Sequence, residues 1–192
     1  MQQWILASQS PRRRELLSRL VSDFEILADD SEETLIPGEK PEQAVKRLAQ
    51  EKAENVSKKT GKDALILAAD TVVVLEGRIL GKPKDEADAF HMLSSLSGNT
   101  HQVFTGIAVL DAKTGRCETA AEMTKVRFRK LSEEEILRYI ASGEPMDKAG
   151  AYGIQEKGAL LVEGIEGDYF NVVGLPLCRL GILLRESFQI EW

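Results

Sequence analysis

The sequence is poor in cysteine and histidine, with two of each among its 192 residues. Cys117 and Cys178 lie far apart and outside any Cys-x-x-Cys motif, which argues against a disulfide framework and against a zinc site. We therefore expect a reducing, cytoplasmic setting. His91 and His101 belong to no recognisable Ser-His-Asp arrangement, so we assign neither of them a catalytic role.

Long apolar runs and an excess of positive charge are also missing. No segment approaches the ~18 apolar residues of a membrane span. The N-terminal stretch "MQQWILAS" has no charged region ahead of an apolar core, so we expect neither a membrane span nor a signal peptide. The net charge is −6, whereas proteins that coat nucleic acid carry a basic surface. We expect no nucleic-acid partner.

The common glycine-rich nucleotide motifs are absent as well. There is no G-x-G-x-x-G, and "GRILGKPK" (77–84) lacks both the spacing of a Walker loop and the Ser or Thr after its lysine. Any phosphate site must therefore be built from scattered side chains.

What is present indicates an α/β protein. Apolar residues make up 43% and charged residues 29%, a composition typical of globular proteins. Helices and strands alternate, but hairpin turns at Glu76-Gly77 and at 112–115 interrupt the alternation, so we expect a mixed, twisted sheet with flanking helices. Hydrophobic patterns predict strands at 4–7, 23–30, 64–75, 101–111 and 116–131, helices at 12–20, 41–59, 85–98, 132–143 and 176–188, and two short strands within 158–174.

The segment "SQSPRRRELL" (8–17) places three arginines at a helix start. Ser10 and Pro11 suit the N-cap and first helical positions. Each cation there lies at the positive end of the helix dipole, which destabilises the helix by ~0.3–1 kcal/mol. The arginines either form a solvated basic helix start, which suits Arg14, or they bind an anion.

In the second case a phosphate group would meet free backbone N–H groups at the helix start. The planar guanidinium groups of Arg12 and Arg13 match phosphate oxygens, and the hydroxyls of Ser8 and Ser10 add donors.

Asp70 and Thr71 interrupt the apolar strand "LILAADTVVV". Aspartate is unfavourable in strands, and a buried carboxylate is costly unless it is paired. The strand either ends at Asp70 and exposes it, or Asp70 lies at the end of a buried strand and binds a metal or activates water.

Two lysines have similar alternatives. Lys52 falls on the apolar stripe of its helix, between Leu48 and Val56. It either extends its ammonium group into water or points at an internal anion. Lys82 in "LGKP" is either a plain loop lysine or a second anion ligand.

The stretch "EPMDKAGAYGIQEKG" (144–158) has glycines that let the backbone approach a ligand. Gln155 either bonds its own backbone or pairs with a uracil or thymine edge, because its amide carries both a donor and an acceptor. Glu32 and Glu33 lie in an acidic loop and are either solvated or, beside Asp70, carboxylate ligands for Mg²⁺.

Together these segments resemble the Maf family of nucleoside triphosphate pyrophosphatases. The matching strings occur in the family's order and cover nearly the whole chain: "LASQSPRRRELL", "EKA" (51–53), "AADTVV", "GKP", "LSGNTHQVFTG", "DKAGAYGIQEKGA" and "VVGLP". The resemblance implies a single Maf-like domain over residues 1–192, with two lobes around a cleft and a fold similar to that of inosine triphosphate pyrophosphatases.

The resemblance also implies a role for each site residue. Asp70 would be the proton acceptor, and Glu33 would join it in binding Mg²⁺ or Mn²⁺. Arg12, Thr71 and Gln155 would set specificity. The substrate-binding set would be Ser8, Arg12, Arg13, Lys52, Thr71, Lys82 and Gln155.

The implied activity is hydrolysis of dTTP, UTP or modified pyrimidine nucleotides to the monophosphate and pyrophosphate. The resemblance further implies a cytoplasmic homodimer. The alternative is a nucleotide-binding regulator of septum formation and cell division without significant turnover.

Overall fold

A computed structural model describes residues 3–29, 33–61 and 63–191. Its backbone contacts divide the chain into two compact units. Unit 1 consists of residues 1–70, 105–122 and 174–192, and unit 2 of residues 71–104 and 123–173.

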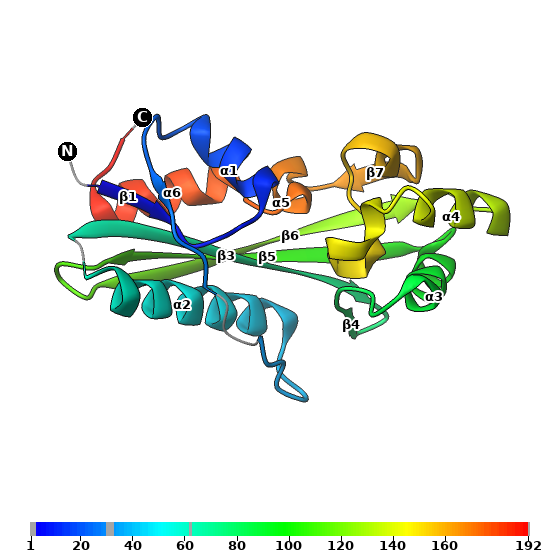
Figure 1. Cartoon of the computed structure of the whole chain (residues 1–192), viewed down its shortest axis with the longest axis horizontal. Coiled ribbons are helices and arrows are strands. Elements are labelled where there is room, and N and C mark those ends of the chain that lie inside the picture. The colour runs from blue at the N-terminus through cyan, green and yellow to red at the C-terminus, as the bar shows by residue number, and fades with distance from the viewer. Residues whose placement is uncertain (1–2, 30–32, 62, 192) are drawn as a thin grey trace. The chain divides into compact units, whose positions relative to one another are not determined.

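Seven strands in the described residues form one mixed sheet in the order β2-β1-β3-β5-β6-β7, with β4 paired to β3 (Figure 1). Strand β1 pairs in parallel with β2 and β3, whereas the β3–β4 and β6–β7 pairs are antiparallel. The predicted mixed sheet is confirmed. The strands are β1 (Gln3–Leu6), β2 (Glu25–Ile26), β3 (Ala64–Leu75), β4 (Arg78–Leu80), β5 (Thr100–Asp111), β6 (Cys117–Phe128) and β7 (Val162–Glu166).

Unit 1 contains α1 (Pro11–Ser18), α2 (Pro41–Thr60) and α6 (Leu177–Phe188). Figure 1 shows α2 on one face of the sheet in this unit and α6 on the other. Helix α2 lies close to β5, since a Cβ added to Gly106 would stand 2.2 Å from the carbonyl oxygen of Val45. As predicted, Gly61 ends α2 in a left-handed conformation, with φ of 57°.

Unit 2 contains α3 (Glu86–Leu96), α4 (Glu133–Ile140), α5 (Tyr169–Val173) and three short 3-10 helices: η1 (Glu144–Asp147), η2 (Ala149–Ala151) and η3 (Glu156–Leu160). Its core packs Leu93, Phe128 and Ile136 with Tyr152. The predicted capping box of Ser132 and Glu135 is present at the start of α4. No helix among the described residues has the length and apolar character needed to cross a bilayer.

Two strand predictions differ from the structure: one of the two strands predicted within 158–174 is a helix, and the strand predicted at 23–30 is too long. In 158–174 the structure has one strand, β7, followed by helix α5. The Asp168 side chain accepts a hydrogen bond from the Phe170 N–H, which turns the chain away from an extended conformation. In the described part of the strand predicted at 23–30, residues 23–29, only Glu25–Ile26 form a strand. Beyond it, Asp29 accepts a hydrogen bond from the Asn55 side chain of α2.

Candidate active site

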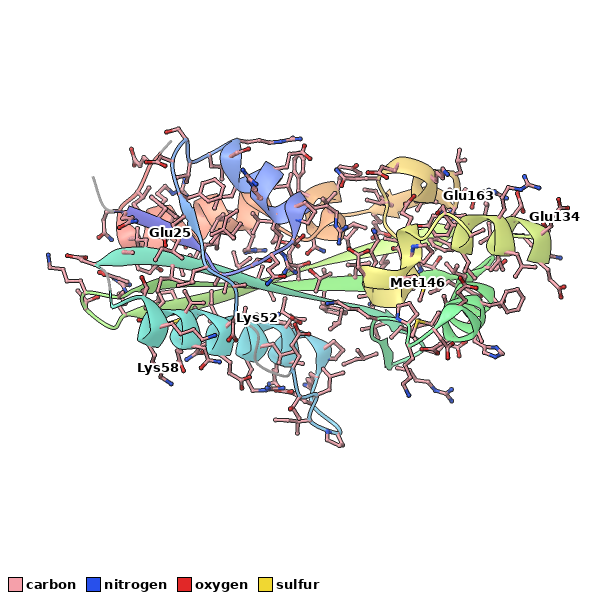
Figure 2. The ribbon with its side chains drawn as sticks, viewed as in Figure 1. Glu25, Lys52, Lys58, Glu134, Met146 and Glu163 are labelled. Atoms are coloured by element: carbon pink, nitrogen blue, oxygen red, sulfur yellow. The ribbon has the colours of Figure 1, made fainter. Side chains whose placement is uncertain are left out.

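Lys52 joins two acidic side chains in unit 1. Its Nζ lies 2.6 Å from Asp70 Oδ1 and 2.7 Å from Glu33 Oε1. The side chains of Lys52 and Asp70 are only 12% and 5% exposed. Figure 2 shows Lys52 on the side of α2 that faces β3, whereas Lys58 points away. The lysine therefore points at an internal anion, Asp70, as well as at Glu33, and the alternative of an ammonium group in water is wrong.

Asp70 lies inside β3 and not at its end. The strand continues to Leu75, so both expectations that placed Asp70 at a strand end were wrong, as was its predicted exposure. Valines follow Asp70 and Thr71, and their β-branched side chains favour continuation of the strand. The carboxylate is tolerated there because Lys52 pairs with it.

Arg13 is fixed by the first turn of α1 and by the chain before α6. Its Nε donates to the carbonyl oxygen of Gly174 at 2.8 Å, and its Nη1 donates to Ser8 Oγ at 3.3 Å. Ser8 Oγ also accepts from the N–H of Ser10, the N-cap residue of α1. Arg14 is exposed, as expected for a solvated position.

The charges around Arg13 show which predicted residues unit 1 brings together. Burial lowers the pKa of the Arg13 guanidinium. The carboxylates of Asp70 and Glu33 act in the opposite direction on this pKa, and the neighbouring Arg12 lowers it further. Arginine remains charged at neutral pH under such shifts. Arg13, Asp70, Glu33 and Lys52 therefore form one electrostatic cluster.

Arg47 is a residue that the sequence did not single out. Its guanidinium donates to both carboxylate oxygens of Glu39, at 3.0 and 2.7 Å, and to the carbonyl oxygen of Thr34 at 3.0 Å. It thus fastens segment 33–40, which carries Glu33, to α2. The sequence signalled only the i,i+4 pairing of Arg47 with Glu51. Glu32, the alternative to Glu33, lies outside the described residues.

Unit 2 holds the other three predicted residues, Thr71, Lys82 and Gln155. The chain segments that carry these three residues come together around Gly150. Its N–H donates to the carbonyl oxygen of Gly81 at 3.0 Å, and a Cβ added there would stand 2.9 Å from the Val73 side chain. Gly150 also has a φ of 68°, which favours glycine.

The side chains of these three residues differ in exposure. Lys82 is exposed in the loop after β4, whereas Thr71 and Gln155 are half-buried. Within the described part of the chain, the Gln155 side chain caps no backbone N–H of η3, although Gln155 is its N-cap residue. Its amide is therefore not used to start that helix.

The donor atoms of Glu33 and Asp70 suit a hard divalent cation. Both carboxylates already converge on one cation, the Lys52 ammonium group. Mg²⁺ prefers oxygen ligands and is commonly held by one or two carboxylates together with substrate phosphates. The described residues contain no cluster of three or more His, Cys, Asp or Glu side chains placed to hold a metal. The pair fits a cation shared with a substrate.

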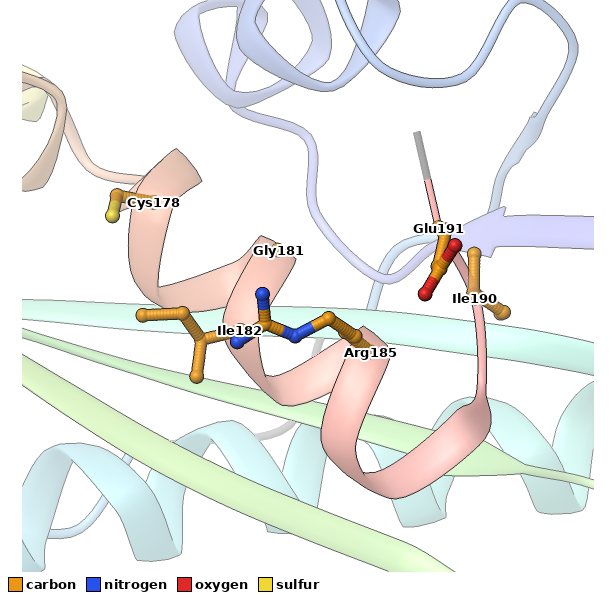
Figure 3. Close-up of a pocket in the computed structure, with 6 residues that line it drawn as sticks. All are labelled: Cys178, Gly181, Ile182, Arg185, Ile190 and Glu191. Atoms are coloured by element: carbon orange, nitrogen blue, oxygen red, sulfur yellow. The ribbon is translucent and has the colours of Figure 1, made fainter.

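A groove of about 400 Å³ lies elsewhere in unit 1, along α6 (Figure 3). None of the predicted site residues lines it. The groove is lined by Cys178, Gly181, Ile182, Arg185, Ile190 and Glu191.

The mixed sheet with flanking helices defines an α/β fold that is also found among solved structures. A solved HAM1 protein from Coxiella burnetii matches with a TM-score of 0.55 at 20% identity, covering 97% of this chain and 100% of that chain. The chain belongs to the Maf family. The model of this family, described as "Maf-like protein", matches residues 3–187.

Curated relatives match over nearly their full lengths. A protein from Alkaliphilus oremlandii is 53% identical over 191 residues, which cover 100% of this chain and 99% of the relative. One from Geotalea uraniireducens is 54% identical over 187 residues, covering 97% and 96%. Both relatives are named dTTP/UTP pyrophosphatase. The family resemblance seen in the sequence is confirmed.

Proposed function

We propose that this protein is a nucleoside triphosphate pyrophosphatase that hydrolyses dTTP and UTP, and modified pyrimidine nucleotides, to the monophosphate and pyrophosphate. The names of relatives at 50–54% identity support this activity. The observation that carries the proposal is the cluster in which Lys52 joins the buried Asp70 and the more exposed Glu33 within the electrostatic reach of Arg13.

In the proposed reaction, water attacks the α-phosphorus and the bond to the oxygen between the α- and β-phosphates breaks. Pyrophosphate leaves and the water oxygen stays on the monophosphate. Asp70 accepts the proton of the attacking water. Lys52 holds one oxygen of Asp70, which fixes the carboxylate. Catalysis of this kind depends mainly on positioning and charge stabilisation.

The basic residues neutralise the triphosphate. Arg12 and Arg13 lie in the first turn of α1, where the positive end of the helix dipole adds to their charge. The backbone does not offer the free N–H groups expected from the sequence, because Pro11 has none and the N–H groups of Arg13 and Arg14 are bonded to Ser10. Ser8, Lys52 and Lys82 complete the phosphate-binding set. A bound polyanion turns the unfavourable placement of cations at this helix start into a favourable one.

Glu33 and Asp70 would hold Mg²⁺ or Mn²⁺, consistent with their all-oxygen donor set. When bound, the metal supplies positive charge to the phosphate oxygens. The chain's own contribution is to keep both carboxylates at one point through Lys52.

Recognition of the base falls to Arg12, Thr71 and Gln155. Uracil and thymine present an N3–H donor beside an O4 acceptor, and the Gln155 amide offers the complementary acceptor and donor. The family resemblance also supports a single domain over residues 1–192, a homodimer and a cytoplasmic location, without nucleic-acid or membrane partners.

A nucleotide panel with Mg²⁺ or Mn²⁺ tests the function, with pyrophosphate and orthophosphate measured separately. We expect pyrophosphate from dTTP and UTP, little of either product from purine nucleotides, and no turnover after chelation of the metal. Orthophosphate as the sole product would mean that a different bond is cut. Tight binding of these nucleotides without release of pyrophosphate would favour the regulator of septum formation.

A further inference from the structure

The segment that carries Gln155 is anchored at both ends to one pair of side chains in unit 2. Tyr139 at the end of α4 accepts a hydrogen bond from the Gly153 N–H, with 3.2 Å between N and Oη. Glu144 at the start of η1 accepts one from the Gly158 N–H, with 3.1 Å between N and Oε1. Tyr139 in turn donates its hydroxyl hydrogen to the same Oε1 at 3.0 Å.

The two ends of this segment also press against each other. A Cβ added to Gly158 would stand 1.7 Å from the carbonyl oxygen of Gly153. A Cβ added to Gly153 would stand 2.8 Å from Cε of Lys148, whose ammonium group donates to the Glu144 carbonyl oxygen. Residues 153–158 therefore form a closed loop, with Gln155 between the anchored ends.

The anchoring pair is well suited to hold the loop. Tyr139 is only 5% exposed, and burial raises the pKa of its hydroxyl above the ordinary value. The hydroxyl therefore stays neutral and can both donate to Glu144 and accept from Gly153. Each of the two side chains thus accepts a hydrogen bond from a backbone N–H of the loop.

Base recognition by a glutamine requires such a fixed backbone. Uracil and cytosine present opposite donor–acceptor patterns at positions 3 and 4. A side-chain amide that is free to turn over can pair with either base, since its oxygen and nitrogen exchange places. Only an amide held in one orientation, at one position, discriminates between them.

We propose that Tyr139 and Glu144 are positioning residues, which fix the backbone on either side of Gln155 and so place its side chain for recognition of a 4-oxo pyrimidine and against a 4-amino pyrimidine. This inference rests on the proposed function, in which Gln155 contacts the base. Neither Tyr139 nor Glu144 touches the substrate in this arrangement.

The test compares kcat/KM for UTP and CTP in Tyr139→Phe, Glu144→Ala and Glu144→Gln variants. We expect the UTP/CTP preference to fall about three- to tenfold in both Glu144→Ala and Tyr139→Phe, because each variant loses one hydrogen bond to the loop and the bond between the two side chains. The change should come mainly from a higher KM for UTP. Glu144→Gln keeps the acceptor oxygen, so its preference should stay within about twofold of the wild type.

Glu134→Ala is the matched control, because Glu134 lies on α4 with its side chain 82% exposed (Figure 2). Its preference should not change. Melting temperatures of all variants separate loop positioning from folding. An unchanged UTP/CTP preference in both Tyr139→Phe and Glu144→Ala would overturn the inference, even if both melt at a lower temperature.

Binding of α,β-imido analogues of UTP and CTP separates this inference from the proposed function. Wild-type binding that favours the UTP analogue, and loses that preference in Glu144→Ala, would support the positioning role even if no pyrophosphate is released. If the wild type releases pyrophosphate from UTP but binds both analogues with equal affinity, the proposed enzymatic activity stands and the positioning role is overturned.

Discussion

Lys52 is the residue on which the unit 1 cluster depends. It stood out in the sequence because a lysine on an apolar helical stripe needs an anionic partner or water. Asp70 stood out for the complementary reason, as a carboxylate in an apolar strand pattern, although its place inside the strand was not predicted. That the two pair at 2.6 Å could not be predicted, since helical and strand periodicities do not fix how a helix is placed along a strand.

We expect Lys52→Met to destabilise the protein by about 3–5 kcal/mol, because it leaves the buried Asp70 carboxylate without its counter-ion. The change is measurable as the free energy of unfolding in urea at neutral pH. Lys58→Met, at an exposed position of the same helix, should stay within about 0.5 kcal/mol of the wild type. Adding Asp70→Asn to Lys52→Met should recover part of the loss. Equal stabilities of the two methionine variants would refute the structural role of the ion pair.

His101 gives unit 2 a separate dependence on pH. Its ring is 1% exposed, and its Nε2 lies 2.7 Å from the hydroxyl of Tyr152, while Nδ1 has no partner among the described residues. Burial lowers the pKa of His101 to about 4 from its ordinary 6.5. Between these values the unfolded chain binds more protons than the folded one. Stability should therefore rise with pH from about 4 to 6.5 and gain nothing from this group above that range.

His101 is expected to change the free energy of unfolding by at most about 3 kcal/mol across this pH range. Urea unfolding at several pH values should show a smaller slope across this window in His101→Gln than in the wild type. His91→Gln, at an exposed position of α3, serves as the control. An identical slope in His101→Gln and wild type would show that His101 is not held neutral.

The first helix, the turn after β3 and the segment 158–174 show what local sequence patterns can and cannot predict at the level of elements. The start of α1 was predictable from Ser10 and Pro11, because capping chemistry is local. The same holds for the turn at Glu76-Gly77, where both residues have positive φ. The segment 158–174 was mispredicted because its conformation depends on Asn171, which bonds the distant Val103 and Thr124.

Arg47 allows the loop that carries Glu33 to be tested as an element. Arg47→Lys keeps the charge but cannot span both Glu39 oxygens and the Thr34 carbonyl oxygen. We expect the Mg²⁺ concentration for half-maximal pyrophosphate release to rise about three- to tenfold, as the loss of one or two hydrogen bonds implies. The rate at saturating Mg²⁺ should change little, because Asp70 is untouched.

Lys46→Ala is the control for this variant, since Lys46 lies next to Arg47 on α2 and pairs with Glu42 within the same helix. Its metal dependence should match that of the wild type. If Arg47→Lys instead lowers the rate at saturating Mg²⁺ and leaves the metal dependence unchanged, the loop does not act through Glu33.

Over the whole molecule, the family motifs fall into both compact units. Unit 1 carries Ser8, Arg12, Arg13, Glu33, Lys52 and Asp70, and unit 2 carries Thr71, Lys82 and Gln155. The sequence predicted family and fold class because ordered motifs span nearly the whole chain, and both are confirmed. It could not predict the contacts that hold the loops, such as that of Arg47 with Thr34, because these depend on packing between distant segments.

The central claim is that Asp70 accepts the proton of the water that attacks the α-phosphorus. The most direct test measures pyrophosphate release from UTP in H₂¹⁸O by the wild type and by Asp70→Asn. We expect ¹⁸O in the monophosphate product of the wild type, and a loss of at least about a hundredfold in rate for a correctly folded Asp70→Asn variant. A variant that releases pyrophosphate at nearly the wild-type rate, or ¹⁸O found in the pyrophosphate, would contradict the claim.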